Sequence, residues 1–86
     1  MIRIETSARR DQVIFAVIGR IESNDLPELK RVIESHDPPV ILDLKAVKLV
    51  DRDGVTFFAN FETNNGRITN CPPYIREWIR REREQQ

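Results

Sequence analysis

The stretch that decides the fold is VILDLKAVKLVDRDGVTFF, from Val40 to Phe58. Its start, VILDL, is a short run that begins with β-branched residues and is apolar at both odd and even positions. Such a strand has apolar side chains on both faces, which predicts a central strand over Val40–Leu44. From Val55 the apolar spacing becomes helical, with Phe57, Phe58 and Phe61 on the inner side. A buried strand followed by an amphipathic helix is typical of an α/β domain.

Strand patterns lie on both sides of this stretch. Ile2–Thr6 alternates apolar and polar residues, and Val13–Ile21 is almost continuously apolar, so we expect a half-buried strand and then one covered on both faces. The polar residues between them suit a hairpin turn, although the Asn-Gly pair of the tightest turns is missing. Arg67–Asn70 predicts a short strand at a sheet edge.

Two further helices are predicted. Asp25 is expected to be the N-cap of the first, with Glu28 completing a capping box and an apolar stripe of Leu26, Leu29, Val32 and Ile33. The prolines near His36–Pro39 must end it. The last helix begins after Pro72, and its inner stripe is Ile75, Trp78 and Ile79.

The predicted order is therefore β-β-α-β-α-β-α within a single domain, residues 1–86. Strands that alternate with helices imply a small mixed, mostly parallel sheet with packed helices, in which the first strand is an antiparallel edge.

Composition excludes several classes of function. Fourteen basic and fourteen acidic residues cancel, which argues against nucleic acid as a partner. The single cysteine, Cys71, excludes an internal disulfide, and nothing supplies a set of zinc ligands, so we expect no metal and no cofactor. No apolar run approaches the ~20 residues of a membrane span, and the first residues lack the apolar core of a signal peptide. We expect a cytoplasmic protein that does not insert into a membrane.

The string Asp51-Arg52-Asp53-Gly54 allows three chemistries. A calcium loop with Gly54 in the glycine position would need carboxylates at Leu49 and Asn60, so it is excluded. A phosphatase that used Asp51 as nucleophile and Asp53 as acid/base would also need a distant acidic pair for magnesium and a lysine. After Gly54 no aspartate follows, so this is the least favoured interpretation. In the third interpretation Asp53 is the N-cap of the following helix and Gly54 lets the backbone turn.

In this region the sequence resembles the STAS domains of bacterial anti-sigma factor antagonists and of sulfate transporter tails. The features that carry the resemblance are Gly19-Arg20 at the end of a strand, Asp43-Leu44 at the end of the next, and Asp51 with Gly54 at a helix start. They occur in the family's order and spacing between about Val13 and Ile79. The chain is a short version of the family pattern.

The resemblance implies a non-enzymatic protein-protein interaction module in signalling and transcription regulation. It implies a protein partner such as an anti-sigma factor or a kinase-like regulator, and it is compatible with a homodimer. The alternative is an accessory subunit of a membrane transporter complex. In the signalling members a kinase phosphorylates the second serine of an Asp-Ser-Ser-Gly pattern, and here Arg52 and Asp53 replace both serines. Asp53 is therefore the switch-site equivalent, acting either as a partial phosphoserine mimic or as a plain helix cap.

The expected partner-binding surface is the loop from Lys48 to Asp53 and the start of the next helix, with Lys48, Asp51, Arg52, Asp53 and Gly54 as its residues. Charges of both signs near a helix N-terminus suit charge-steered protein recognition. No residue is predicted to be catalytic. Asp43 is expected to order its loop by accepting hydrogen bonds.

Overall fold

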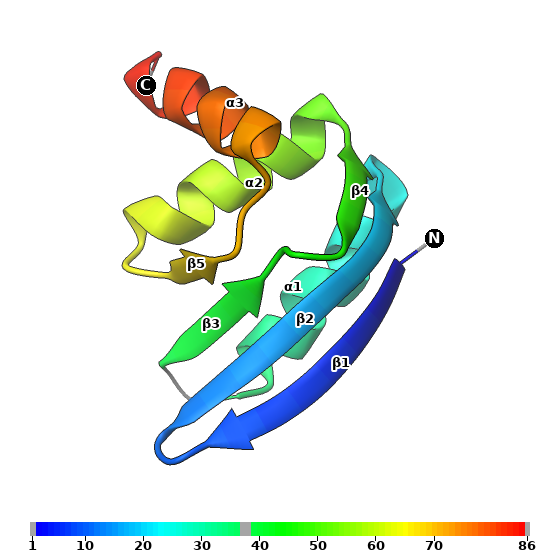
Figure 1. The fold of residues 1–86 in the computed structure, drawn as a ribbon, viewed down its shortest axis with the longest axis vertical. Coiled ribbons are helices and arrows are strands. Elements are labelled where there is room, and N and C mark those ends of the chain that lie inside the picture. Colours follow the sequence, from blue (N-terminus) through cyan, green and yellow to red (C-terminus); the bar gives the residue numbers. More distant parts are fainter. Residues whose placement is uncertain (1, 37–38, 86) are drawn as a thin grey trace.

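A five-stranded mixed sheet organises the chain, as Figure 1 shows for the computed structural model, which describes residues 2–36 and 39–85. The strands are β1 (Ile2–Arg9), β2 (Gln12–Ile21), β3 (Val40–Asp43), β4 (Val47–Val50) and β5 (Arg67–Thr69). β1 pairs antiparallel with β2, while β3 and β4 run parallel to β2, and β5 runs parallel to β3. The predicted fold class, a mixed and mostly parallel sheet with packed helices, is confirmed.

Each of the described α-helices follows a strand. A 3-10 turn (Ser23–Asp25) leads into α1 (Leu26–Glu34), α2 (Arg52–Thr63) follows β4, and α3 (Pro73–Glu84) ends the described chain. None of the described helices is both long enough and apolar enough to cross a membrane. The predicted element order is correct except for β4, which the sequence pattern did not indicate.

The long strand β2 pairs with two different strands along the same edge. Its first half, from Val13 to Ala16, pairs with β3, and its last residues, from Gly19 to Ile21, pair with β4. The register shifts between Gly19 and Arg20, and Gly19 has a φ of 104°, which only glycine adopts without strain. Gly19 therefore bends β2 where it changes partner, and its N–H donates to the carbonyl oxygen of Ala46 at 3.1 Å.

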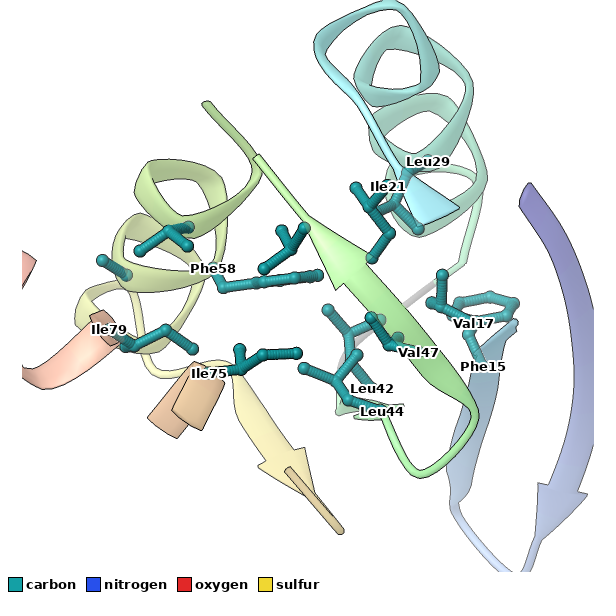
Figure 2. Close-up of a cluster of buried hydrophobic side chains, with 13 residues drawn as sticks. Phe15, Val17, Ile21, Leu29, Leu42, Leu44, Val47, Phe58, Ile75 and Ile79 are labelled. Carbon is teal, nitrogen blue, oxygen red and sulfur yellow. The ribbon is translucent and has the colours of Figure 1, made fainter. Parts of the chain in front are cut away.

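One hydrophobic core lies between the sheet and the helices. β2 contributes Phe15, Val17 and Ile21, and the helices contribute fully buried Leu29, Phe58, Ile75 and Ile79. Figure 2 shows Phe58 and Ile75 pointing toward Leu42 and Leu44. Every helix therefore buries its apolar stripe in the same cluster.

The helices leave the other face of β2 uncovered. Ile14, Ala16 and Ile18 alternate with the core residues of β2 and are only half-buried, outside the core cluster. The prediction of a strand covered on both faces is therefore wrong. The sheet is one layer of a two-layer structure, with helices against a single face (Figure 1).

Two local predictions also need correction. The hairpin turn is tight, because Arg9 pairs with Gln12 across two residues and Arg10 adopts a φ of 54°. Asp25 does not cap α1 with its side chain; its carboxylate turns back and accepts the N–H of Glu22 at 2.9 Å. The break at His36–Pro39 falls between α1 and β3, but residues 37 and 38 lie outside the described part of the chain.

Candidate functional site

Asp51 is the N-cap of α2. It has extended backbone, and its Oδ1 accepts the N–H of Gly54 at 2.9 Å. Its Oδ2 accepts the N–H of Ser23 at 2.8 Å, at the entry to the first helical turn after β2. Both carboxylate oxygens are thus engaged by backbone donors, an arrangement that suits a structural cap and disfavours Asp51 as a nucleophile.

Asp53 lies in the first turn of α2 and faces solvent. The prediction that Asp53 caps α2 is wrong, because the helix begins at Arg52 and Asp51 supplies the cap. Within the described residues, Asp53 makes no hydrogen bond or ion pair. Its negative charge lies in the first turn of α2, where it complements the helix dipole and remains available to another molecule.

Arg52 bridges two helices at the same surface. Its Nε lies 3.4 Å from the Oε1 of Glu82 on α3, and its side chain is largely exposed while that of Glu82 is mostly buried. The ion pair therefore holds one face of the guanidinium toward α3 and leaves the rest in water.

Gly54 is buried, and its role is close packing rather than a turn. A Cβ atom at this position would lie 2.4 Å from the Cγ2 of Val50 and 3.3 Å from the Cγ2 of Ile21. Because Gly54 has no side chain, α2 approaches β2 and β4 closely. Its expected role in permitting a special backbone conformation is not observed, since its φ is not positive.

Lys48 lies in β4, not in a loop as predicted. Its side chain is exposed, and its backbone carbonyl accepts the hydroxyl hydrogen of Tyr74 on α3 at 2.6 Å. This bond, like the pair between Arg52 and Glu82, brings α3 beside the predicted segment.

The sequence interpretation missed three exposed apolar side chains. Trp78 is 36% exposed, Tyr74 50% and Leu49 52%, whereas Ile79 is completely buried. The prediction that Trp78 belongs to the core is therefore wrong. Tyr74 and Trp78 are one helical turn apart, so they lie on the same side of α3.

We call the resulting region the α2–α3 surface. It combines exposed charges from β4 and α2 with exposed aromatic residues from α3. Its members are Lys48, Leu49, Arg52, Asp53, Tyr74 and Trp78. Of the predicted site residues, Asp51 and Gly54 lie beneath this surface and support it.

Asp43 has the structural role that the sequence indicates. Its Oδ1 accepts the N–H of Lys45 at 3.0 Å and the side-chain amide of Asn70 at 3.3 Å. Asn70 has a φ of 54° at the end of β5. Asp43 therefore ties together the ends of two neighbouring parallel strands.

On the other flank of α3, Arg76 forms a bidentate pair with Glu62 of α2, at 2.8 and 2.9 Å. This hydrogen bonding raises the pKa of Arg76. Burial raises the pKa of the nearby Cys71 thiol, and the positive charge of Arg76 opposes part of that rise. The raised pKa favours the protonated thiol of Cys71, which is the less reactive form.

A cavity of about 600 Å³ opens at the C-terminal end of α2. Its apolar lining comes from Ile33, Val40, Phe57 and Phe61. It shares no residue with the α2–α3 surface, which lies around the other end of that helix. Among residues 2–36 and 39–85, no three His, Cys, Asp or Glu side chains are grouped to hold a metal ion.

Comparison with known proteins identifies the fold. No protein-family model matches the sequence, and no curated protein is similar to it at a significant level. A crystal structure of an uncharacterized protein from the DUF3478 family with a SpoIIAA-like fold, from Shewanella loihica PV-4, superposes with a TM-score of 0.54 and 15% sequence identity. The match covers 77% of this chain and 60% of the Shewanella chain. This likeness confirms the fold that the sequence resemblance predicts: the chain has the SpoIIAA-like fold of STAS domains.

Proposed function

We propose that this protein is a non-enzymatic interaction module of the anti-sigma factor antagonist type, and that it binds a protein partner through the α2–α3 surface. The SpoIIAA-like fold fits such a module. The observation that carries the proposal is the exposed pair Tyr74 and Trp78 beside Arg52 and Asp53.

The residue types on this surface are those that dominate protein interfaces. Tryptophan, tyrosine and arginine are enriched among residues whose truncation costs the most binding energy. An aromatic residue on a helix is normally buried by its own domain, yet Trp78 is 36% exposed and its neighbour Ile79 is not exposed at all. A partner that covers Trp78 would remove this apolar area from water.

The charges beside the aromatic pair supply orientation. Lys48 and Arg52 are exposed, and Asp53 is exposed in the first turn of α2. Complementary charges on a partner would accelerate association and fix the relative orientation of the two proteins. Because Asp53 stands where the signalling members carry the regulated serine, this charge is permanent in our proposal and the partner meets one state only.

The test is capture and titration of the partner. Tagged wild-type protein is used to capture interacting proteins, and the captured partner is then titrated with Trp78→Ala, Arg52→Ala, Asp53→Ser and the control Arg80→Ala. Arg80 is exposed on the outer face of α3 and pairs with Glu77 and Glu84 of its own helix, so its loss should leave binding unchanged.

We expect Trp78→Ala to weaken binding by at least tenfold, since loss of a hot-spot side chain costs ~2 kcal/mol or more. Arg52→Ala should slow association and reduce its salt dependence. Asp53→Ser should alter affinity without unfolding the protein. If the titration curves of Trp78→Ala, Arg52→Ala and Asp53→Ser all match that of wild type, the binding surface lies elsewhere and the proposed site is refuted.

A further inference from the structure

The free edge of β1 is the longest exposed backbone edge in the described part of the chain. β1 has eight residues and, among the described strands, pairs only with β2. β5, at the other end of the strand order, has three residues. A long edge strand presents unpaired N–H and C=O groups to any strand that can align with it.

The register identifies which backbone groups of β1 point outward. In β2 the N–H of Val13 donates to Pro39 at 3.3 Å and that of Gly19 to Ala46 at 3.1 Å, so odd-numbered residues of β2 face away from β1. Even-numbered residues of β2 therefore hydrogen-bond with β1, and their partners in β1 are odd-numbered. The outward N–H and C=O groups of β1 consequently belong to Ile2, Ile4, Thr6 and Ala8.

The side chains of β1 divide in the same alternating way. Ile2 and Ile4 are half-buried against the core. Arg3 and Glu5 lie on the open face of the sheet with 72% and 59% of their side chains exposed, and they form an ion pair of 2.8 Å. One face of β1 thus carries a positive and a negative side chain two residues apart, while Ile2 and Ile4 lie on the other face.

We propose that β1 pairs antiparallel with β1 of a second copy of this chain, about a twofold axis at Ile4. Ile4 then faces Ile4 of the partner subunit, and Ile2 faces Thr6 of the partner subunit, both as hydrogen-bonded pairs through their outward groups. Arg3 lies opposite Glu5 of the partner subunit, and the symmetry repeats this pair. These positions are non-hydrogen-bonded pairs, where cross-strand side chains are closest.

Charge disfavours the neighbouring registers. A twofold axis at Glu5 places two glutamates opposite each other, and an axis at Thr6 places Arg3 opposite Arg9. Like charges in directly opposed positions destabilise a sheet. The Ile4 register avoids both clashes.

An axis at Ser7 also matches charges, because it places Glu5 opposite Arg9. That register, however, leaves Ile2 and Ile4 outside the paired segment and aligns exposed Thr6 with exposed Ala8. The Ile4 register instead covers the half-buried apolar residues of β1, so apolar burial decides between the two.

The interface is small. The paired segment runs from Ile2 to Thr6, and such a contact buries much less than the roughly 1,600 Å² of a standard stable interface. The dimer should therefore be weak and visible only as the protein concentration rises, up to about 1 mM.

The test reverses one charge of β1 in each variant and measures association by sedimentation velocity over a range of protein concentrations. Arg3→Glu alone and Glu5→Arg alone each place like charges opposite each other, so each variant should dissociate at least about tenfold more readily than wild type. An equimolar mixture of the two variants should associate, because each then meets its opposite charge. Circular dichroism verifies that each variant is folded.

The mixture separates the proposed contact from effects within one subunit. Both variants lose the internal ion pair between Arg3 and Glu5, and mixing restores only pairs between subunits. Arg9→Glu is the register control. It should not alter a dimer about Ile4, because Arg9 lies outside the paired segment. Loss of dimerisation in this variant would indicate a dimer about Ser7 and would refute the proposed register. A wild-type protein that stays monomeric to about 1 mM, or a mixture that does not associate, would overturn the proposal.

Discussion

The carboxylate of Asp51 lies 2.8 Å from the backbone N–H of Ser23, and this contact joins the starts of two helices that are far apart in the sequence. The same carboxylate accepts the N–H of Gly54 at 2.9 Å. One side chain therefore orients both α2 and the turn that leads into α1.

Replacement of Asp51 should be much more costly than replacement of Asp53. Asp51→Ala removes an N-cap, worth ~0.5–2 kcal/mol, and a second charge-assisted bond of comparable value, so we expect a loss of about 1–4 kcal/mol. Asp53→Ala, the matched control two residues away, removes only an exposed charge near the helix dipole and should cost less than about 1 kcal/mol. Urea denaturation measures both, and equal losses would contradict the assignment of Asp51 as the cap.

Addition of one methyl group at Gly54 should destabilise the protein, although alanine favours helices. The new Cβ would lie 2.4 Å from Val50, so strand and helix must separate. Overpacking costs ~1–3 kcal/mol, which exceeds the ~1 kcal/mol gained in helix propensity. Asn60→Ala, at an exposed position of the same helix, should be neutral or stabilising. A Gly54→Ala protein as stable as wild type would show that α2 can shift freely.

Adjacent residues of α3 should respond differently to truncation. Ile79 is fully buried, so Ile79→Ala should cost ~2–5 kcal/mol. Trp78 is 36% exposed, so Trp78→Ala should cost less than the ~3–5 kcal/mol of a fully buried tryptophan. Chemical denaturation of the two variants tests the assignment, and a larger loss for Trp78→Ala would mean that its ring is a core element after all.

The thiol of Cys71 should be slow to alkylate. Because burial raises its pKa in the folded protein, its thiolate fraction at pH 8 is lower than that of an unfolded chain, and the thiolate is the reacting species. The expected result is slower reaction with iodoacetamide in buffer than in urea, with glutathione as the control for the effect of urea on the reagent. Equal rates for folded and unfolded protein would contradict the raised pKa.

Much of the fold was predictable because the relevant signals are local. The apolar run Val40–Leu44, the helical spacing after Val55 and the stripe of α1 each report burial through periodicity alone. β4 escaped detection because Val47–Val50 has buried residues only at its two ends, with exposed Lys48 and Leu49 between them. A four-residue segment without alternation carries no strand signal.

The candidate site was predictable only in outline. The segment Lys48–Gly54 stands out by its charges, but the sequence could not tell which aspartate caps the helix, since both positions suit an N-cap. The contribution of α3 was not detectable in the sequence, because Tyr74 and Trp78 lie at least twenty residues away and reach the segment only through packing.

The sequence by itself determined the order of most elements, the apolar faces of the helices and the position of the charged helix start, because these depend on neighbours within a turn or two. Only the tertiary structure decided which strands neighbour β2, which aspartate is the cap and which face of α3 remains open. Asp51 also accepts a hydrogen bond from Ser23, and the exposure of Trp78 depends on how α3 packs against α2. Such contacts join residues far apart in the chain, so no local pattern contains them.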